Sequence, residues 1–447
     1  MTATEPLPRR TSRLLALILL PAAGLERARG WRRLALALSY VLILLSGSAL
    51  YLWTTQLQGL PDIGDPFDLA AFSAIEVPDD ENAFVVYRQA NALKKPLDWS
   101  TAQNPNAPPG TLILRWEDAE PPVQRWLQAN RVALNHWRVG TERPKALLIP
   151  PAELSYSSVF EPALELRDFA QLSVLEATRH EQVGEMERAW LWYRAVLRCG
   201  RHAGEHGPII QKMVGQTIQG FAINELTTWA EDPRTDSQIL RQALEELKTL
   251  RSSLPPNSDA LKVEYLALLK AIDDSEPYVN NSHLHEQIMP DWYQAYSGIP
   301  QVMAFVRRDK ERSRRVAQQF FASWLAYVDH PSGQRPPLEF LDSGGSYPPA
   351  AHARALPPEE LDRWFRSTML ARYLLPGYQN SLSVLDRERF QIDALLVHVA
   401  DQLYLREHGQ PPARFEDLVG PYLDDLPPGY EGLGADPQRY GDEDDLE

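Results

Sequence analysis

The sequence predicts a mainly α-helical protein with one N-terminal transmembrane helix and an α-helical extracytoplasmic domain. Three observations predict this fold class. Residues 34–53 form an uncharged run that is long enough to span a bilayer. Beyond it, apolar residues recur with the period of an amphipathic helix, most regularly between residues 161 and 252. Runs of alternating β-branched residues, which would indicate strands, do not occur. Helix hairpins, with a solenoid-like stack as one arrangement, are the expected architecture.

The uncharged run extends from Leu34 to Trp53 and would form a helix roughly 30 Å long, which matches the hydrocarbon core of a bilayer. Tyr51 and Trp53 stand at its far end, where interfacial aromatic residues are expected. The basic residues that set the topology precede it and are Arg27, Arg29, Arg32 and Arg33. We therefore expect a single-pass protein of the inner (cytoplasmic) membrane, with its N-terminus inside and its lipid contact through residues 34–53.

A shorter apolar run precedes the predicted membrane helix. Residues 14–25 are too few to span a bilayer and include Pro21. They fit an interfacial segment or the apolar part of a cleaved signal, and the sequence leaves these two alternatives open. In either case the longer run at 34–53 would stop in the membrane.

The charge of the chain is unevenly distributed. Its 45 basic and 60 acidic residues give a net charge of −15. Residues 1–33 hold seven arginines and two glutamates, so the remainder has 38 basic and 58 acidic residues and a net charge of −20. A domain with this large a negative charge repels the phosphate backbone of nucleic acids, which argues against nucleic acid as a partner. The single cysteine, Cys199, excludes an intramolecular disulfide and is expected to be a small buried residue on a helix.

Composition and the positions of helix-breaking residues divide the chain into six predicted segments. Residues 1–33 are a cytoplasmic basic segment and 34–53 the transmembrane helix. A linker, 54–80, ends at Asp79-Asp80, which are placed to cap a helix from Glu81. The remaining segments are the helical domain 81–383, a C-terminal helical module 384–440 and an acidic tail 441–447.

Three apolar stripes predict three successive helices with short breaks at Gly184 and at Gly207-Pro208. The first stripe is Leu166, Phe169, Ala170, Ser173, Val174 and Ala177, the second is Met186, Ala189, Trp190, Tyr193, Val196 and Leu197, and the third is Ile210, Met213, Val214, Thr217 and Phe221. Further helices are predicted at 123–139, 237–252, 259–273, 303–327, 359–373 and 385–408. The tryptophans on these helices are expected to pack in the core.

The segment Gly184–Leu197, GEMERAWLWYRAVL, resembles the second helix of a tetratricopeptide repeat. Gly184, Ala189 and Tyr193 stand where that pattern has a turn glycine, a small residue and an aromatic residue. Val196 stands where a second small residue is usual, and no further copy occurs at the expected period. The resemblance therefore implies one helix pair.

A larger part of the chain resembles a group of uncharacterised single-pass membrane proteins of planctomycete-type bacteria. The matching pieces are PDDENA at 78–83, the stretch 184–222 and YLREHGQPPARFEDLVGPYLDDLPPGY at 404–430. The last piece also resembles a C-terminal module of some pseudopilin-like exported proteins. It departs from the usual ending, because Asp436-Pro437 is followed by the acidic tail. The group has no assigned activity, so the resemblance implies topology and compartment only.

Two polar segments are the candidate sites. His202 and His206 in HAGEH would share one face of a helix, as zinc ligands do, but no third ligand can be named. We therefore expect no metal and no other cofactor, with these histidines as the weak candidates. The loop 273–292 gathers acids, amides, His283 and His285, and long polar loops of this kind either host sites or serve as solvated connections.

The catalytic residues, if any, are unknown from sequence, because no catalytic triad, phosphate loop or nucleotide fingerprint occurs. The expected function is a membrane-tethered, non-catalytic helical interaction or scaffold protein that faces the periplasm and binds other membrane or envelope proteins. One alternative is an exported enzyme with a site near 202–206 or 273–292. Another alternative is a component of a secretion or pseudopilus-type system, as the C-terminal module would imply.

Overall fold

The computed structural model describes residues 29–96, 115–154, 161–273, 308–340, 342, 346–349, 354–368 and 379–430. The chain divides into two compact units. Unit 1 contains residues 1–62, 274–315 and 368–370, and unit 2 contains residues 63–273, 316–367 and 371–447. The chain is mainly helical, as predicted. Residues 14–25, nearly all of the loop 273–292 and the tail 441–447 lie outside the described residues.

Unit 1 contains the predicted membrane helix as α2, Trp31–Thr55. None of its side chains is buried, and its large apolar residues point outward along its whole length. It is long and apolar enough to cross a membrane, and a signal sequence near an N-terminus has the same properties. The helix gives way to a turn in which Gly59 adopts a positive φ, before the buried Leu60.

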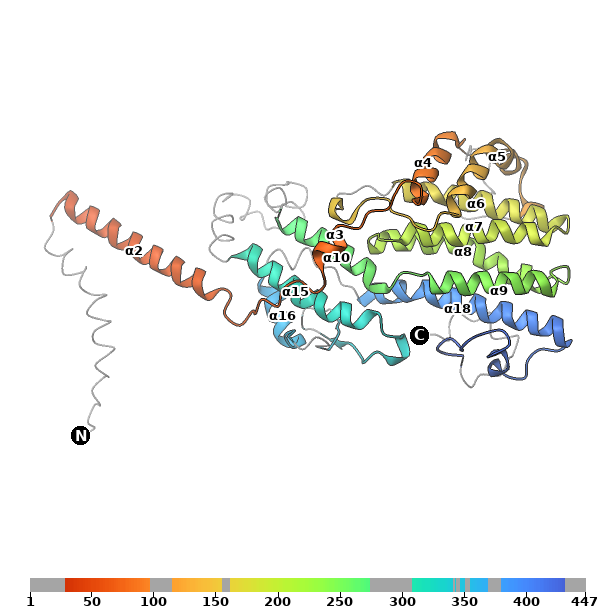
Figure 1. The fold of residues 1–447 in the computed structure, drawn as a ribbon. Coiled ribbons are helices and arrows are strands. Elements are labelled where there is room, and N and C mark those ends of the chain that lie inside the picture. The colour runs from red at the N-terminus through yellow and green to blue at the C-terminus, as the bar shows by residue number, and fades with distance from the viewer. Residues whose placement is uncertain are drawn as a thin grey trace. The chain divides into compact units, whose positions relative to one another are not determined.

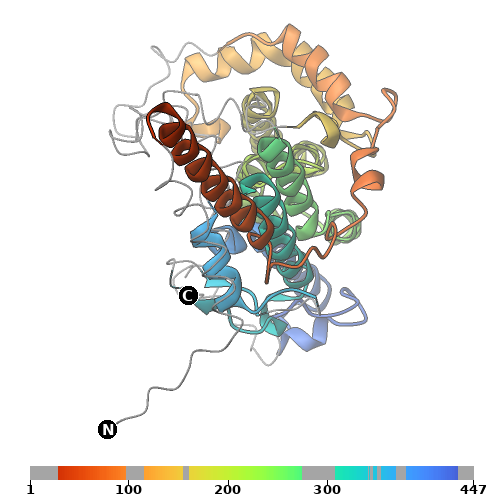
Figure 2. The ribbon, with the colours of Figure 1, turned by 90° about the vertical axis from the view of Figure 1, so that its left-hand side faces the viewer.

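Unit 2 is built from long helices that pack in antiparallel pairs (Figure 1). Its central helices are α6 (Glu161–Gln182), α7 (Met186–Gly204), α8 (Ile209–Glu231), α9 (Ser237–Ser252) and α18 (Gln379–His408). Helices α6, α7 and α8 pack against one another, and α18 packs on both α8 and α9. Figure 2 views several of these helices nearly end-on.

Further elements complete the fold. A second helix pair, α4 (Ala83–Leu93) and α5 (Pro121–Thr141), packs beside α6 and α7. The other elements are α3 (Leu69–Ser73), η1 (Trp116–Asp118), η2 (Pro151–Glu153), α10 (Asn257–Asp273), α15 (Asp309–Val328), η3 (Ser332–Gln334), β1 (Glu339–Phe340), β2 (Ser346–Tyr347), α16 (Pro358–Ser367) and η4 (Phe415–Leu418). Strands β1 and β2 form a two-residue antiparallel ladder that the sequence pattern does not predict.

Aromatic residues fill the core of unit 2, as expected for the tryptophans. Trp190 stacks on Trp229 with ring centroids 5.5 Å apart, and Trp137 stacks on Phe169 at 5.9 Å. Every residue of the first two predicted apolar stripes is buried. The turn between them is at Gly184, whose φ of +80° suits glycine, so α6 and α7 form the predicted hairpin.

The third predicted stripe, on α8, is confirmed only in part, because Val214 and Phe221 pack against the core but the other three residues are exposed. Ile210 and Met213 are 54% and 40% exposed, and Thr217 is also exposed. In the first half of α8, the buried positions instead include a glycine and four long polar side chains, Gln211, Lys212, Gln216 and Gln219. In its second half, the buried residues are apolar: Ala222, Leu226, Trp229 and Ala230. The first half turns its polar side chains inward because α7 approaches too closely there for bulky apolar side chains.

Two glycines set that close approach. A Cβ atom on Gly215 would lie 2.4 Å from the carbonyl oxygen of Gly200, and one on Gly200 would lie 2.6 Å from the carbonyl oxygen of Gly215. Real Cβ atoms do not tolerate such distances, so the crossing of α7 and α8 requires glycine at both positions.

The entry to unit 2 also differs from the prediction. The segment 54–80 is not only a linker, because α2 continues to Thr55 and α3 forms within it. Asp79-Asp80 do not cap the next helix. Asn82 does, since its Oδ1 accepts from the backbone N–H of Phe84, while its Nδ2 donates to the carbonyl of Leu147, 3.0 Å away.

The C-terminal segment shares the core of unit 2. The predicted stripe Ile392, Leu395, Leu396, Val399 and Leu403 on α18 is entirely buried, and so are Phe415 and Leu418 of η4. Gly409 ends α18 with a φ of +71°, and its N–H donates to the carbonyl of Leu405, as the predicted left-handed cap requires. Helix α16 starts where predicted but ends at Ser367 instead of Tyr373.

We expect Gly215→Ala to lower the free energy of unfolding by about 1–3 kcal/mol, because the new methyl group meets backbone and not a movable side chain. Gly220→Ala is the matched control on the same helix, since nothing lies within 4 Å of its Cβ position. That control should be neutral or stabilise the protein by about 0.5–1 kcal/mol. Urea unfolding of both variants measures the difference, and equal stabilities would contradict the tight crossing.

Candidate functional site

The polar corner of unit 2 is the place where α7 ends and α8 begins, and it contains the segment 202–206 that the sequence marked as a candidate site. Glycine and proline at 207–208 prevent α7 from continuing. Helices α4, α10 and α18 contribute side chains to the same region. We define the polar corner by Tyr87, Cys199, Arg201, His202, Glu205, His206, Lys212, Asn257, Asp259, Asp386 and Glu388.

His202 is completely buried at the end of α7. Its Nδ1 shares a hydrogen bond of 2.8 Å with the hydroxyl of Tyr87, which α4 supplies. Burial, aided by the charge of Arg201, holds the pKa of His202 well below its ordinary value. The imidazole is therefore neutral at pH 7, and none of its surface is exposed to a substrate in solution.

Cys199 lies one turn before His202 and is also completely buried. Burial raises the pKa of its thiol to about 12, against weaker lowering by hydrogen bonds with Trp137 and Tyr87. The reactive form of cysteine is the thiolate, which is negligible at neutral pH for such a group. The prediction that Cys199 is a buried, unreactive residue fits this geometry.

His206 does not share a helical face with His202, so the predicted zinc-like pairing is wrong. Helix α7 ends at Gly204, and His206 adopts a left-handed conformation with a φ of +51°. Both its backbone N–H and its Nδ1 lie 3.1 Å from a carboxylate oxygen of Asp259 on α10. Among the described residues, no group of three histidine, cysteine or acidic side chains is placed to hold a metal ion.

Glu205 and Arg201 close this side of the polar corner. The guanidinium of Arg201 lies 3.2 Å from a carboxylate oxygen of Glu205 and also donates to the backbone carbonyl of Pro144. Burial raises the pKa of Glu205, and the charges of Arg201 and His206 work against that rise. The chain between α7 and α8 is therefore fixed by charges on its own and neighbouring elements.

The most deeply buried charges are on the other side of the polar corner. Lys212 Nζ lies 3.1 Å from Glu388 Oε2, and the two side chains are only 4% and 5% exposed. Gln219 donates to the second carboxylate oxygen of Glu388 at 3.1 Å, so both of its oxygens are engaged. This pair joins α8 to α18 across the core.

Further hydrogen bonds extend the contacts of the Lys212–Glu388 pair toward α10. Asn257 donates to the carboxylate of Asp386 at 2.9 Å, and both terminal nitrogens of Arg335 donate to the same carboxylate. Gln216 donates to the backbone carbonyl of Val384, 2.5 Å away. These contacts form a connected network that fixes the positions of α8, α10 and α18 relative to one another. In it, each charge lies against an opposite charge or a hydrogen-bond partner.

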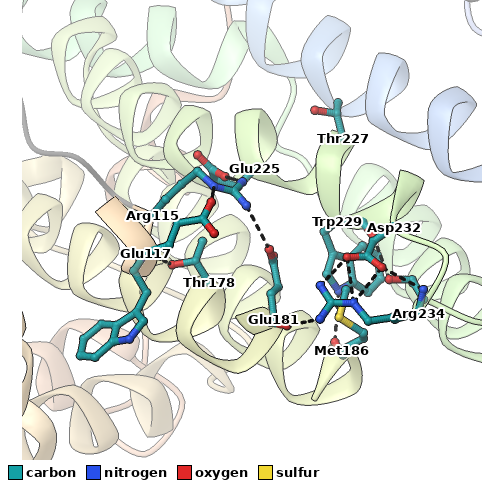
Figure 3. A network of polar contacts seen from close by, with 12 residues as sticks. Arg115, Glu117, Thr178, Glu181, Met186, Glu225, Thr227, Trp229, Asp232 and Arg234 are labelled. Carbon is teal, nitrogen blue, oxygen red and sulfur yellow. Dashed lines mark hydrogen bonds and ion pairs between the residues drawn. The ribbon is translucent and has the colours of Figure 1, made fainter. Parts of the chain in front are cut away.

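Figure 3 shows a separate polar network at the other end of α6 and α8. Arg115, which precedes η1, lies 2.7 Å from Glu225 on α8 and 3.9 Å from Glu181 on α6. Burial raises the pKa of Glu181, whose Oε1 accepts a 2.5 Å hydrogen bond from the hydroxyl of Tyr193. Arg234 donates to the backbone carbonyl of Glu181, which ties the α8–α9 connection to the end of α6.

One open groove lies between α9, α18 and the segment after η4. Its volume is about 250 Å³, and it is lined by Lys248, Arg251, Ser252, Arg389, Leu396, Leu423, Asp424, Asp425 and Pro427. Arg251 is held at 2.5 Å by Asp393 and at 3.5 Å by Asp425. The groove carries charges of both signs, and none of the described residues that line it is a histidine or a cysteine.

Comparisons with protein-family models, with curated proteins and with solved structures gave no match to this chain. Its function therefore has to be argued from the two units themselves.

Sequence reasoning found His202 and His206 but missed their partners Tyr87 and Asp259, which are distant in the chain. It also missed the Lys212–Glu388 pair. A signal for the pair was present, because Gln211, Lys212, Gly215, Gln216 and Gln219 recur at helical spacing and so define a polar face of their own. The apolar residues on the opposite face of α8 form a stronger pattern, which predicted that the opposite face would be buried.

We expect Lys212→Met to destabilise unit 2 by about 3–5 kcal/mol, because it leaves the Glu388 carboxylate buried without its counter-charge. The double variant Lys212→Met/Glu388→Leu should recover much of this loss. Lys248→Met is the control, since Lys248 pairs with the exposed Glu245 on α9 and should cost under about 1 kcal/mol. Denaturant unfolding measures the stability of each variant. A double variant that is no more stable than Lys212→Met alone would show that Lys212 and Glu388 do not act as a unit.

Proposed function

We propose that the chain is a membrane-tethered, non-catalytic helical interaction or scaffold protein, with unit 2 outside the cytoplasm and facing the periplasm. The observation that carries the tether is α2, a 25-residue helix with no buried side chain. Leu34, Leu42, Ile43 and Leu45 are each more than half exposed on it. An apolar surface of this length is unfavourable in water and is suited to lipid.

The orientation rests on the residues at the two ends of α2. Arg29, Arg32 and Arg33 stand at its start, and Tyr51 and Trp53 stand near its end. Basic residues beside a membrane helix favour the cytoplasmic side, and aromatic residues favour the interface. Arg27, the fourth basic residue of the prediction, lies outside the described residues.

The non-catalytic part of the proposal rests on how the polar groups of unit 2 are used. In the polar corner, Cys199 and His202 are completely buried and uncharged at neutral pH. His206 is partly exposed, but its imidazole is paired with the carboxylate of Asp259. An exported enzyme with its site at 202–206 would need a base or nucleophile that is not already engaged within the fold. The loop 274–292, the other proposed location, lies outside the described residues.

The interaction part of the proposal rests on the outward face of α8. Ile210 and Met213 are exposed one turn apart, in the first half of a helix whose buried positions there are mainly polar. Exposed apolar side chains that lie together on a rigid helix commonly mark protein contacts. A role in a secretion or pseudopilus-type system has support only from the likeness of residues 404–430 to an exported module.

We expect a periplasm-dependent reporter fused after residue 60 to be active, because the arginines before α2 hold the N-terminus inside. The matched control carries glutamate at Arg29, Arg32 and Arg33, which removes the charge bias and should reduce the reporter signal. Carbonate extraction of the untagged chain tests the anchor itself. Reporter activity confined to the cytoplasm, or release of the chain by carbonate, would overturn the tether.

We expect a photoreactive residue in place of Met213 to form a covalent adduct with another membrane or envelope protein when illuminated in native cells. The control replaces Gln128, an exposed residue of α5, by the same group. Adducts at both positions alike would indicate random collision, and an absence of adducts at 213 would argue against α8 as the interaction face.

A further inference from the structure

We propose that unit 1 carries a basic juxtamembrane patch that binds the phosphate groups of anionic phospholipids on the extracytoplasmic side of the bilayer. We define the basic juxtamembrane patch by Arg308, Lys310, Arg314 and Arg315, from the start of α15, together with Trp53 at the end of α2. The inference rests on the proposed tether, because it requires α2 to lie in the membrane.

The contacts within unit 1 bring these two segments together, although Trp53 and Arg308 are 255 positions apart in sequence. The guanidinium of Arg308 lies over the ring of Trp53, 4.5 Å from its centroid. Arg315 donates to the backbone carbonyl of Leu60 at 3.0 Å. The first two turns of α15 are therefore fixed beside the point where the chain leaves α2.

The depth of Trp53 places the patch at the headgroups. From Trp31 to Trp53 the helix rises by about 33 Å, close to the thickness of the hydrocarbon core. A tryptophan at each end then lies at a membrane interface. Arg308, stacked on Trp53, shares that depth, where lipid phosphates are the nearest abundant anions.

The charge of this segment is opposite to that of the exported chain. Residues 308–315 hold five basic and two acidic residues, whereas the chain after residue 33 has a net charge of −20. Glu311 pairs with Arg315 at 2.9 Å, and Asp309 is buried. Lys310 is exposed, and Arg308 and Arg314 are partly exposed.

The chemistry favours a lipid surface over a protein or a free anion. Arginine binds phosphate oxygens in a bidentate manner and stacks on aromatic rings at the same time. Several basic side chains beside a membrane helix add their attractions to a surface of negative headgroups, but a single small anion can contact only one or two of them. Since the segment is distant from α2 in sequence, it does not enter the charge bias that orients the helix.

The test uses the full chain, purified in an uncharged detergent, and follows thermal unfolding with added lipid. Phosphatidylglycerol should raise the melting temperature by about 3 °C or more, and equal amounts of phosphatidylcholine or inorganic phosphate should not. The variant Arg308→Gln/Lys310→Gln/Arg314→Gln should lose the response. Arg188→Gln/Arg363→Gln/Arg414→Gln removes the same charge from exposed positions of unit 2 and should keep it.

Two further variants are included in the test. Arg308→Lys/Arg314→Lys retains the positive charge and should retain most of the stabilisation by phosphatidylglycerol. Lys310→Glu changes a single exposed residue and serves if the triple variant does not fold. An equal response to phosphatidylcholine, an equal response to inorganic phosphate, or a response that survives in both Lys310→Glu and the triple variant would overturn the inference. If carbonate releases the chain from membranes, the tether fails; a chain that stays anchored without preferring the anionic lipid refutes the patch alone.

Discussion

The distance between α7 and α8 constrains most of unit 2. Gly200 and Gly215 allow two backbones to approach so closely that neither helix can present a bulky apolar side chain at the crossing. Near this crossing, the inward positions of α8 are occupied mainly by long polar side chains, which form hydrogen bonds with α18 and with the end of α7. Burying Lys212 follows from this geometry, and a buried lysine requires a buried acid, which Glu388 supplies.

A core held in this way differs from one filled by leucine. Apolar contacts are tolerant of small shifts, whereas a buried ion pair with both carboxylate oxygens engaged tolerates few alternative registers. The Lys212–Glu388 pair therefore specifies how α18 lies on α8, while the apolar stripe of α18 supplies the attraction. The C-terminal segment depends on both, since its residues Phe415 and Leu418 join the same core.

The sequence was informative where one face of a helix was clearly apolar, and it failed where two faces competed. The stripes on α6 and α7 were buried as predicted, and burial extends beyond them to Leu172, Leu175 and Trp192. On α8, Ile210 and Met213 outweighed Gln211 and Lys212 in the pattern, and only the glycine crossing, which depends on Gly200 in another helix, decides which face turns inward. Asn82 was missed for a similar reason, since its second partner, Leu147, is distant in the chain. The partners of His202 and His206 likewise come from α4 and α10, so no local spacing could have given them.

Cys199 has a consequence for how the protein is made. Its single thiol is enclosed between α7 and its neighbours, and no second thiol exists in the chain. A domain that matures in an oxidising compartment with this composition needs no oxidoreductase and has no wrong pairing to correct. The same thiol becomes accessible only when the core opens, and an oxidant that takes up the two electrons and two protons released can then join two opened chains through one disulfide. Disulfide-linked dimers isolated from cells would thus record past unfolding, which makes this cysteine a natural reporter of damage to the core.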